Sequence, residues 1–373
     1  MVPRYTPTVA ALPATVPFVG PETLERRAGR PFAARLGANE SLFGPSPRAV
    51  EAMARAAAEA WMYGDPEALE LRSAIAAHHG LTPAHVVAGE GIDGLLGNLV
   101  RLTVGPGDAV VTSDGAYPTF NFHVAAQGGT LHKVPYAGDH EDPAALIARA
   151  AATDARLVYL ANPDNPMGSH HPAAVVEAMV AALPPGTLLV LDEAYGDLAP
   201  PGTLPHVAAD DPRVIRMRTF SKGYGLAGLR VGYALAEPAL ITAFDKLRNH
   251  FGLGRVAQAG AMAALADHSH LARVVAQVEA ARDTFGATAR AHDLIPLPSA
   301  TNFLTIDTTP VAGARGGDFA RALRDALVAR GIFVRMPFVA PQDRCIRVTL
   351  GPAAAHAAFA AALPLALRDA GAR

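Results

Sequence analysis

The chain has 373 residues, of which half are hydrophobic and 18% are charged, and its formal net charge at pH 7 is −2. This length predicts two domains with a large buried core, and the small net charge argues against nucleic acid or an anionic membrane as the main partner. Cys345 is the only cysteine, the proline-rich residues 1–20 lack a signal-peptide core, and no apolar run reaches membrane-span length, so a cytoplasmic protein is expected.

Residues 1–45 are rich in proline and are expected to be irregular. From residue 85 onward, short apolar strands alternate with helices. The expected strands cover residues 86–87, 109–112, 130–135, 157–161, 188–191, 214–217 and 231–236. Such alternation predicts an α/β fold with a mostly parallel sheet covered by helices, and ligands in such sheets bind at the carboxyl ends of strands.

A long helical region is expected over residues 238–292, with a break near 251–254. After it, strands at 302–306, 332–335 and 345–350 alternate with helices at 317–330 and 352–370. This pattern predicts a smaller α+β domain. We therefore predict a large domain over residues 46–255 and a small domain formed by residues 1–45 and 256–373.

A glycine-rich turn over residues 89–94 reads Gly-Glu-Gly-Ile-Asp-Gly and has an acid, Asp114, twenty residues after its last glycine. It follows an expected strand and opens a helix, which is the setting of a dinucleotide-binding fingerprint. A long preceding segment and the acid Asp93 on the turn weaken that interpretation. The free N–H groups of Gly91, Ile92 and Asp93 can instead bind a single phosphate. A nicotinamide enzyme therefore stays open at this point.

Residues 218–233 read Arg-Thr-Phe-Ser-Lys-Gly-Tyr-Gly-Leu-Ala-Gly-Leu-Arg-Val-Gly-Tyr. Lys222 thus lies in a glycine-rich loop between two apolar runs, where burial would favour the neutral amine that forms a Schiff base. Thr219, Ser221 and Arg230 surround this lysine in sequence and can hold a dianionic phosphate.

This segment resembles the lysine segment of fold-type I aminotransferases that use pyridoxal 5'-phosphate (PLP), most closely the histidinol-phosphate aminotransferase family. The resemblance extends from Asn39 to Gly351 and implies the PLP-dependent transferase fold type I. It also implies that Lys222 holds the cofactor and moves a proton from the substrate. In this family 2-oxoglutarate is a common amino acceptor.

Two further segments carry the resemblance. Residues 188–195 read Leu-Leu-Val-Leu-Asp-Glu-Ala-Tyr, and residues 162–168 read Asn-Pro-Asp-Asn-Pro-Met-Gly. A carboxylate beside the pyridine nitrogen stabilises the protonated ring. The resemblance assigns this role to Asp192, and it makes Tyr195 and Asn165 hydrogen-bond donors to the ring hydroxyl oxygen.

Two aromatic positions are also implied by the resemblance. Phe120, after Pro118 and Thr119, is the expected ring stacked on the cofactor, with Tyr117 as the less well aligned choice. Tyr63, in a Tyr-Gly-Asp-Pro turn, is expected to cross a homodimer interface to the cofactor phosphate of the other subunit.

Arginines dominate the expected substrate site. Arg347 lies inside an apolar strand, where an arginine rarely stays unpaired, and the resemblance places it on the substrate α-carboxylate. Arg335 is the expected partner of the distal group, and Asn39 and Phe18 complete the set. Phe18 lies where the family commonly has a tyrosine for the substrate phosphate. Arg255 replaces a small polar residue and could meet an additional acidic group.

The sequence therefore predicts a PLP-dependent transaminase. Its amino donor would be an amino acid or amine, such as histidinol phosphate or an aromatic amino acid, and its acceptor a 2-keto acid. A PLP-dependent lyase or decarboxylase of the same fold is the alternative, and a non-enzymatic PLP-binding protein is a third. Neighbouring histidines lack ligand companions at metal spacing, so no metal is expected.

Overall fold

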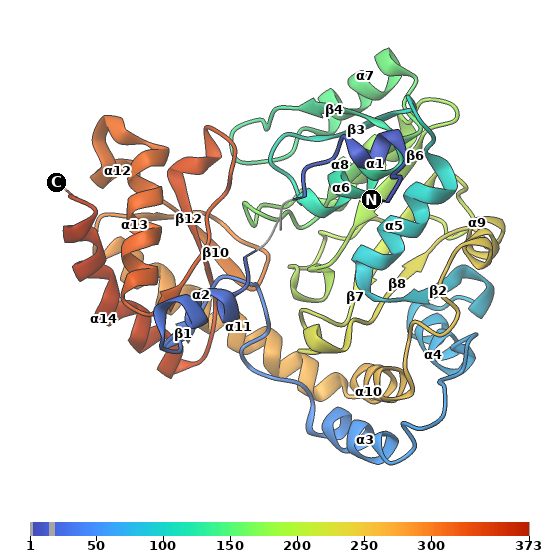
Figure 1. Ribbon diagram of the computed structural model, residues 1–373, viewed down its shortest axis with the longest axis horizontal. Coiled ribbons are helices and arrows are strands. Elements are labelled where there is room, and N and C mark those ends of the chain that lie inside the picture. Colours follow the sequence, from blue (N-terminus) through green and yellow to red (C-terminus); the bar gives the residue numbers. More distant parts are fainter. Residues whose placement is uncertain (1–2, 15–18, 373) are drawn as a thin grey trace.

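The computed structural model describes residues 3–14 and 19–372. Its centre is a seven-stranded sheet with the strand order β2-β8-β7-β6-β5-β3-β4 (Figure 1). The strands are β2 (Val86–Gly89), β3 (Ala109–Ser113), β4 (Thr130–Val134), β5 (Leu157–Ala161), β6 (Leu188–Asp192), β7 (Val214–Thr219) and β8 (Gly232–Leu235). β8 runs antiparallel to both neighbours, and the other adjacent pairs are parallel. The predicted mostly parallel sheet is confirmed.

Helices cover both faces of this sheet because alternate residues of each strand point to opposite sides. In β5, Leu157 and Tyr159 pack with residues of α5 (Gly91–Thr103) and α6 (Pro118–Ala126). Val158 and Leu160 pack on the other face with α7 (Pro143–Thr153) and α8 (Ala173–Ala181). A strand buried on both faces explains the continuous apolar runs in the sequence.

The helical region expected over residues 238–292 is interrupted before residue 255, where the break near 251–254 was predicted, and again between residues 265 and 268. Its elements are α9 (Pro238–Ala243), a single 3-10 turn (Phe244–Lys246), α10 (Arg255–Leu265) and α11 (His268–Arg290). The buried side of α10 shares a core with α3 (Pro47–Ala57) and α4 (Leu69–His79). We therefore propose that the larger domain extends to the end of α10, one helix beyond the predicted boundary at residue 255.

The smaller domain has its own antiparallel sheet of order β12-β10-β9. It contains β9 (Ile295–Pro296), β10 (Phe303–Asp307), β12 (Cys345–Thr349), α12 (Thr309–Ala312), α13 (Gly317–Ala329) and α14 (Ala353–Asp369). β1 (Ala34–Arg35) joins it by parallel pairing with β11 (Ile332–Phe333). α11 leads from the larger domain along this one, so the two domains lie side by side (Figure 1).

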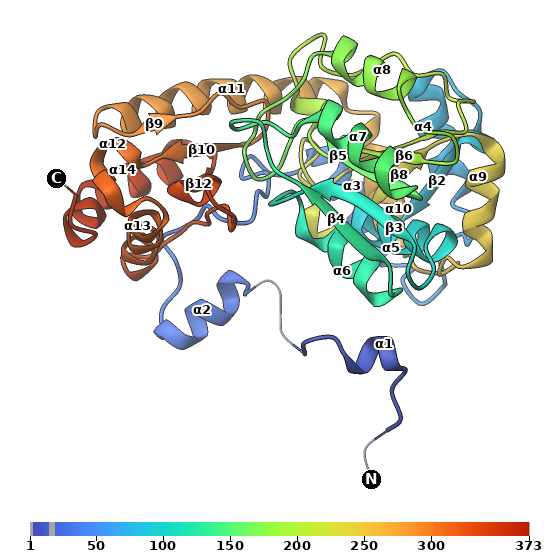
Figure 2. The ribbon, with the colours of Figure 1, turned by 90° about the horizontal axis from the view of Figure 1, so that it is seen from above.

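The expectation that residues 1–45 are irregular is wrong for part of the segment. It contains α1 (Pro7–Ala10) and α2 (Pro21–Ala28), both at the edge of the molecule in the view of Figure 2. Each begins with a proline at its first turn, which suits that position because the missing N–H would be unpaired there. Gly29 ends α2 in the left-handed conformation.

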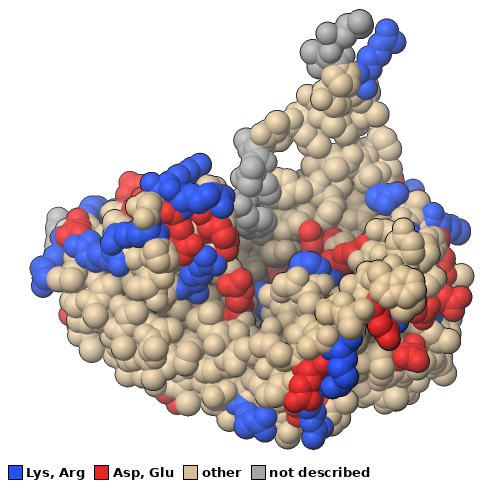
Figure 3. All heavy atoms as spheres, turned by 60° about the horizontal axis from the view of Figure 1, so that its bottom comes forward, with Lys and Arg blue, Asp and Glu red and all other residues tan. Residues whose placement is uncertain are grey.

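Within the described ranges, no helix is long and apolar enough to cross a membrane. On the face drawn in Figure 3, basic and acidic side chains are interspersed over both domains. This distribution agrees with the small net charge of the chain.

Candidate active site

Lys222 lies in the loop between β7 and β8, at the wall shared by two adjacent cavities of about 250 Å³ each. Its Nζ donates a hydrogen bond to the backbone oxygen of Asn39 at 2.9 Å. Burial, assisted by the positive charge of Arg347, lowers the pKa of Lys222 to about 8. The lysine is therefore close to the neutral, nucleophilic form at physiological pH, as its sequence setting predicts.

The first cavity ends in a cradle of hydroxyl and guanidinium groups. Thr219 Oγ1 donates to Ser221 Oγ at 3.0 Å, and Arg230 Nη1 lies 3.3 Å from the same oxygen. Gly91, at the start of α5, faces this arginine so closely that a Cβ there would lie 2.5 Å from Arg230 Nη2. The helix N-terminus therefore points its unpaired N–H groups at the cradle, which suits a phosphate.

The glycine-rich turn serves this same cradle, since Ile92 and Asp93 line the first cavity beside Arg230. The Asp93 carboxylate lies 3.0 Å from His123 Nε2, so that oxygen is occupied by a neighbouring side chain. The backbone of the turn thus lies beside Arg230 in the first cavity, which fits the single-phosphate interpretation better than the nicotinamide alternative.

Asp192 ends β6 and lines the first cavity. Its Oδ2 accepts a hydrogen bond from the Tyr159 hydroxyl at 2.7 Å, and its Oδ1 accepts one from the Ala194 N–H at 2.9 Å. Burial raises the pKa of Asp192, whereas these two hydrogen bonds lower it. Sequence reasoning missed Tyr159, although a polar aromatic residue within an otherwise aliphatic strand was a usable signal.

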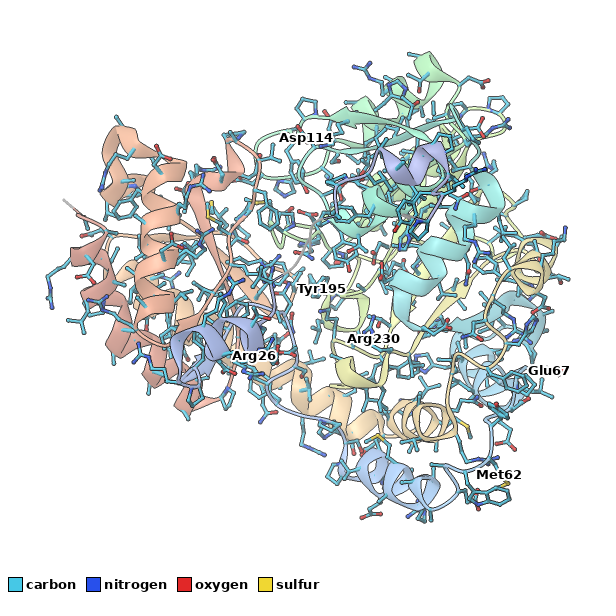
Figure 4. All side chains as sticks on the ribbon, in the orientation of Figure 1. Arg26, Met62, Glu67, Asp114, Tyr195 and Arg230 are labelled. Carbon is cyan, nitrogen blue, oxygen red and sulfur yellow. The ribbon has the colours of Figure 1, made fainter. Side chains whose placement is uncertain are left out.

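Two amide side chains and a phenol also line the two cavities. Asn39 Nδ2 donates to the Tyr195 hydroxyl at 3.0 Å, and Arg347 Nη1 donates to Asn165 Oδ1. Tyr195 and Asn165 both line the first cavity. In Figure 4 the labelled side chains of Tyr195 and Arg230 lie in the middle of the view, where the two domains face each other.

Phe120, which was predicted to stack on the cofactor, lines neither of the two cavities. It is fully buried and stacks on Tyr159, with ring centroids 4.8 Å apart and an interplanar angle of 21°. Tyr117 lines both cavities instead. It precedes the first residue of α6 and has a non-helical backbone, so its side chain does not follow the direction that the helix gives to Phe120.

Two arginines line the second cavity, together with Asn39, Tyr117 and Asn165. Arg335 and Arg347 face each other in an antiparallel bridge, a register that places side chains on the same side. Arg347 Nη2 donates to the Gly37 oxygen at 3.3 Å, and its buried Nε has no hydrogen-bond partner among the described residues. Arg335 Nη2 donates to the Val19 oxygen at 3.0 Å. The predicted residue Phe18 lies outside the described residues.

Tyr63 and Arg255 lie outside both cavities of their own chain. The Tyr63 side chain is 79% exposed and its ring lies 4.8 Å from that of Phe251. Arg255 donates to Glu59 at 3.3 Å and to the Tyr63 oxygen at 3.1 Å. Arg255 therefore stabilises the turn that contains Tyr63, through a hydrogen bond to the backbone of that turn. This position does not support the expectation that Arg255 meets a substrate anion.

The first cavity brings together the groups that PLP requires. A buried amine faces a buried carboxylate, and a cradle that only a glycine at position 91 leaves open lies at one end. These groups match the aldehyde, the ring nitrogen and the phosphate of the cofactor. The fold and the site together define a fold-type I PLP-dependent enzyme.

Comparison with known proteins narrows this class. Residues 34–363 match the family model described as aminotransferase class I and II, and the chain belongs to this family. It is 32% identical to a histidinol-phosphate aminotransferase of Moorella thermoacetica over 97% of this chain and 92% of the relative. It is 37% identical to one from Anaeromyxobacter sp. over 89% of this chain and 91% of the relative.

A solved structure agrees with these relatives. The crystal structure of histidinol-phosphate aminotransferase from Sinorhizobium meliloti in complex with pyridoxal-5'-phosphate is 52% identical, with a TM-score of 0.94. The match covers 99% of this chain and 98% of that chain. The protein is thus a PLP-dependent transaminase, and the comparisons do not favour the lyase alternative.

Proposed function

We propose that this aminotransferase takes the amino group of histidinol phosphate and passes it to a 2-keto acid such as 2-oxoglutarate. The names of its relatives support this donor. The observation that carries the proposal is the pair Arg335 and Arg347, which line one cavity beside Lys222. The phosphate ester of histidinol phosphate is a dianion that lies close to the reacting amine. The guanidinium groups of Arg335 and Arg347, which lie on the same side of their β-bridge, complement its charge and geometry.

The same pair also suits the second half of the reaction. A 2-keto acid such as 2-oxoglutarate carries a carboxylate next to its reacting carbon, where the phosphate ester of the donor would otherwise lie. Burial lowers the pKa of Arg347 only to about 10, so this guanidinium stays positively charged at neutral pH. One anion site can therefore receive the donor and the acceptor in turn.

When bound, PLP supplies an electron-accepting ring that permits C–H cleavage next to the amine. Lys222 Nζ would hold the cofactor and then, once released, carry the proton between the substrate carbon and the cofactor. Asp192 would face the ring nitrogen and keep it protonated, while Tyr195 and Asn165 would donate to the ring oxygen. Tyr117 would cover the ring, and Thr219, Ser221 and Arg230 would hold the phosphate.

The direct test is to add amino donors singly to the purified PLP-loaded protein and to follow its visible absorbance. Histidinol phosphate should bleach the yellow band, and 2-oxoglutarate should restore it. Histidinol, which lacks only the phosphate, should react roughly 10–100-fold less efficiently because charge-assisted hydrogen bonds are lost. Equal efficiency for the two donors, or a preference for an aromatic amino acid, would refute the proposed donor.

A matched variant tests the anion site itself. Arg335→Gln should raise the KM for histidinol phosphate while the reaction of histidinol stays near that of the wild type. A variant that slows both donors equally would instead mean that Arg335 supports the fold and does not read the phosphate.

We also infer that the protein is a cytoplasmic homodimer in which Tyr63 reaches the phosphate cradle of the partner. The exposure of Trp61 (82%) and of Tyr63, next to the half-exposed Phe251, supports this inference, because adjoining exposed aromatic residues often mark an interface. Met62, within the same turn, lies at the outer edge of the view in Figure 4. Analytical ultracentrifugation should give a dimer mass, and a monomer at micromolar concentration would contradict it.

A further inference from the structure

We propose that Tyr159 is a positioning residue that keeps the Asp192 carboxylate ionised and aimed into the first cavity, and that Phe120 holds Tyr159 in place. This inference rests on the assignment of Asp192 as the partner of the PLP ring nitrogen. It adds Tyr159 of β5 to the site that sequence reasoning assembled, and it gives Phe120 of α6 a different role from the one expected.

The contact between Tyr159 and Asp192 is short and buried. The phenol donates to Oδ2 at 2.7 Å from the neighbouring strand of the sheet. The Ala194 N–H donates to Oδ1 at 2.9 Å. Because each carboxylate oxygen thus has a donor of its own, the carboxylate plane is fixed by two independent bonds. The remaining lone pairs of Asp192 are left for a group in the cavity that it lines.

Phe120 explains why the phenol stays in this position. Both rings are fully buried and stacked, and they belong to one core cluster with residues of β6 and β7. A ring packed in this way has little freedom to rotate away from Asp192. The aromatic residue that the sequence suggested as a cofactor contact therefore acts one layer further out, through Tyr159.

The proposed function of this arrangement concerns the proton that the Asp192 carboxylate would share with the ring nitrogen of PLP. A buried carboxylate prefers to be neutral, and a neutral carboxyl group could not stabilise a protonated ring nitrogen. Hydrogen-bond donation from Tyr159 stabilises the carboxylate and reduces its affinity for the proton. Burial also raises the pKa of Tyr159 well above its usual value, so the phenol remains a donor at working pH. The proton shared by Asp192 and the cofactor should consequently stay on the nitrogen.

The test uses Tyr159→Phe, which removes only the hydroxyl and keeps the stacking ring. PLP labelled with 15N at the ring nitrogen reports by NMR whether that nitrogen is protonated. In the variant the signal should move toward the unprotonated value, and the dissociation constant of PLP should rise roughly tenfold. Phe120→Leu keeps the hydroxyl but loosens it, so a smaller shift in the same direction is expected.

The matched control is Tyr233→Phe, which deletes another buried phenol hydroxyl, one that lies 2.9 Å from His79 Nε2. It should leave the 15N signal and PLP binding unchanged. In an Asp192→Asn background, Tyr159→Phe should have no further effect, because its action runs through the carboxylate.

Three results would overturn the inference: a wild-type 15N signal in Tyr159→Phe, an equal change in Tyr233→Phe, or an undiminished effect of Tyr159→Phe without the Asp192 carboxylate. Each measurement is made without an amino donor. Failure of histidinol phosphate as the donor would therefore leave this test intact, and failure here would leave the donor assignment intact.

Discussion

Gly91 offers the sharpest test of the phosphate cradle. It begins α5 with a φ of +74°, and a Cβ at this position would lie 2.5 Å from Arg230 Nη2. Gly91→Ala therefore imposes two separate costs, one on the backbone and one on the arginine. Since the obstructing atom is the end of a flexible side chain, we expect the protein to fold and Arg230 to move away from the cradle.

The two costs have different sizes and different readouts. A left-handed conformation in a non-glycine residue costs about 1–2 kcal/mol, which lowers the stability of the protein. Displacing Arg230 removes a charge-assisted contact with the phosphate, worth about 1.5–3 kcal/mol, so PLP should bind roughly 10–100-fold more weakly. The backbone cost lowers the stability of the PLP-free protein. The displacement of Arg230 affects only the affinity for PLP.

Gly80 provides a matched control for the backbone cost. It ends α4 with a φ of +67°, and a Cβ there would meet nothing within 4 Å. Gly80→Ala should lose similar stability in urea unfolding of the PLP-free protein but bind PLP like the wild type in equilibrium dialysis. Wild-type PLP affinity in Gly91→Ala, or equal weakening in Gly80→Ala, would refute the proposed role of this turn.

Three other outcomes are expected. In the PLP-free protein, the reaction of Lys222 with PLP should accelerate as pH rises through about 8, because the neutral amine attacks and burial lowers its pKa; a stopped-flow midpoint near pH 10 would contradict this. Arg218→Leu should reduce the free energy of unfolding by roughly 3–5 kcal/mol, since it leaves buried Glu193 and Asp197 without this partner; a loss below about 1 kcal/mol in urea would argue against it. Mixing Lys222→Ala and Tyr63→Ala chains should restore activity, because each heterodimer has one site with both an intact Lys222 and an intact Tyr63 from the partner. If mixed dimers stay inactive, Tyr63 does not act across the interface.

Local patterns in the sequence determined the class of fold and the chemical centre of the site. Alternation of apolar strands with helices predicts a mostly parallel sheet because a strand buried on both faces must be apolar throughout. The segment around Lys222 and the strand ending at Asp192 are short, continuous stretches. Because the residues of each stretch are contiguous in the sequence, Lys222 and Asp192 could be identified without knowing which strands are neighbours in the sheet.

Tertiary structure decided which side chains reach those groups. Lys222 bonds to the backbone of Asn39, which lies 183 positions away in the chain. Tyr159 meets Asp192 only because β5 and β6 pair in one register. Phe120 is buried outside the cavities, whereas the backbone angles at the start of α6 direct Tyr117 into the first cavity.

The domain boundary depends on long-range packing in a similar way. The sequence of α10 is compatible with either domain, and its packing against α3 and α4 supports our proposal that it belongs to the larger one. Spacing along a chain predicts which elements form and which way their faces point. Spacing does not predict the long-range contacts that bring Tyr159 and Asp192 to the first cavity and Arg335 and Arg347 to the second. Those contacts depend on the packing of the whole chain.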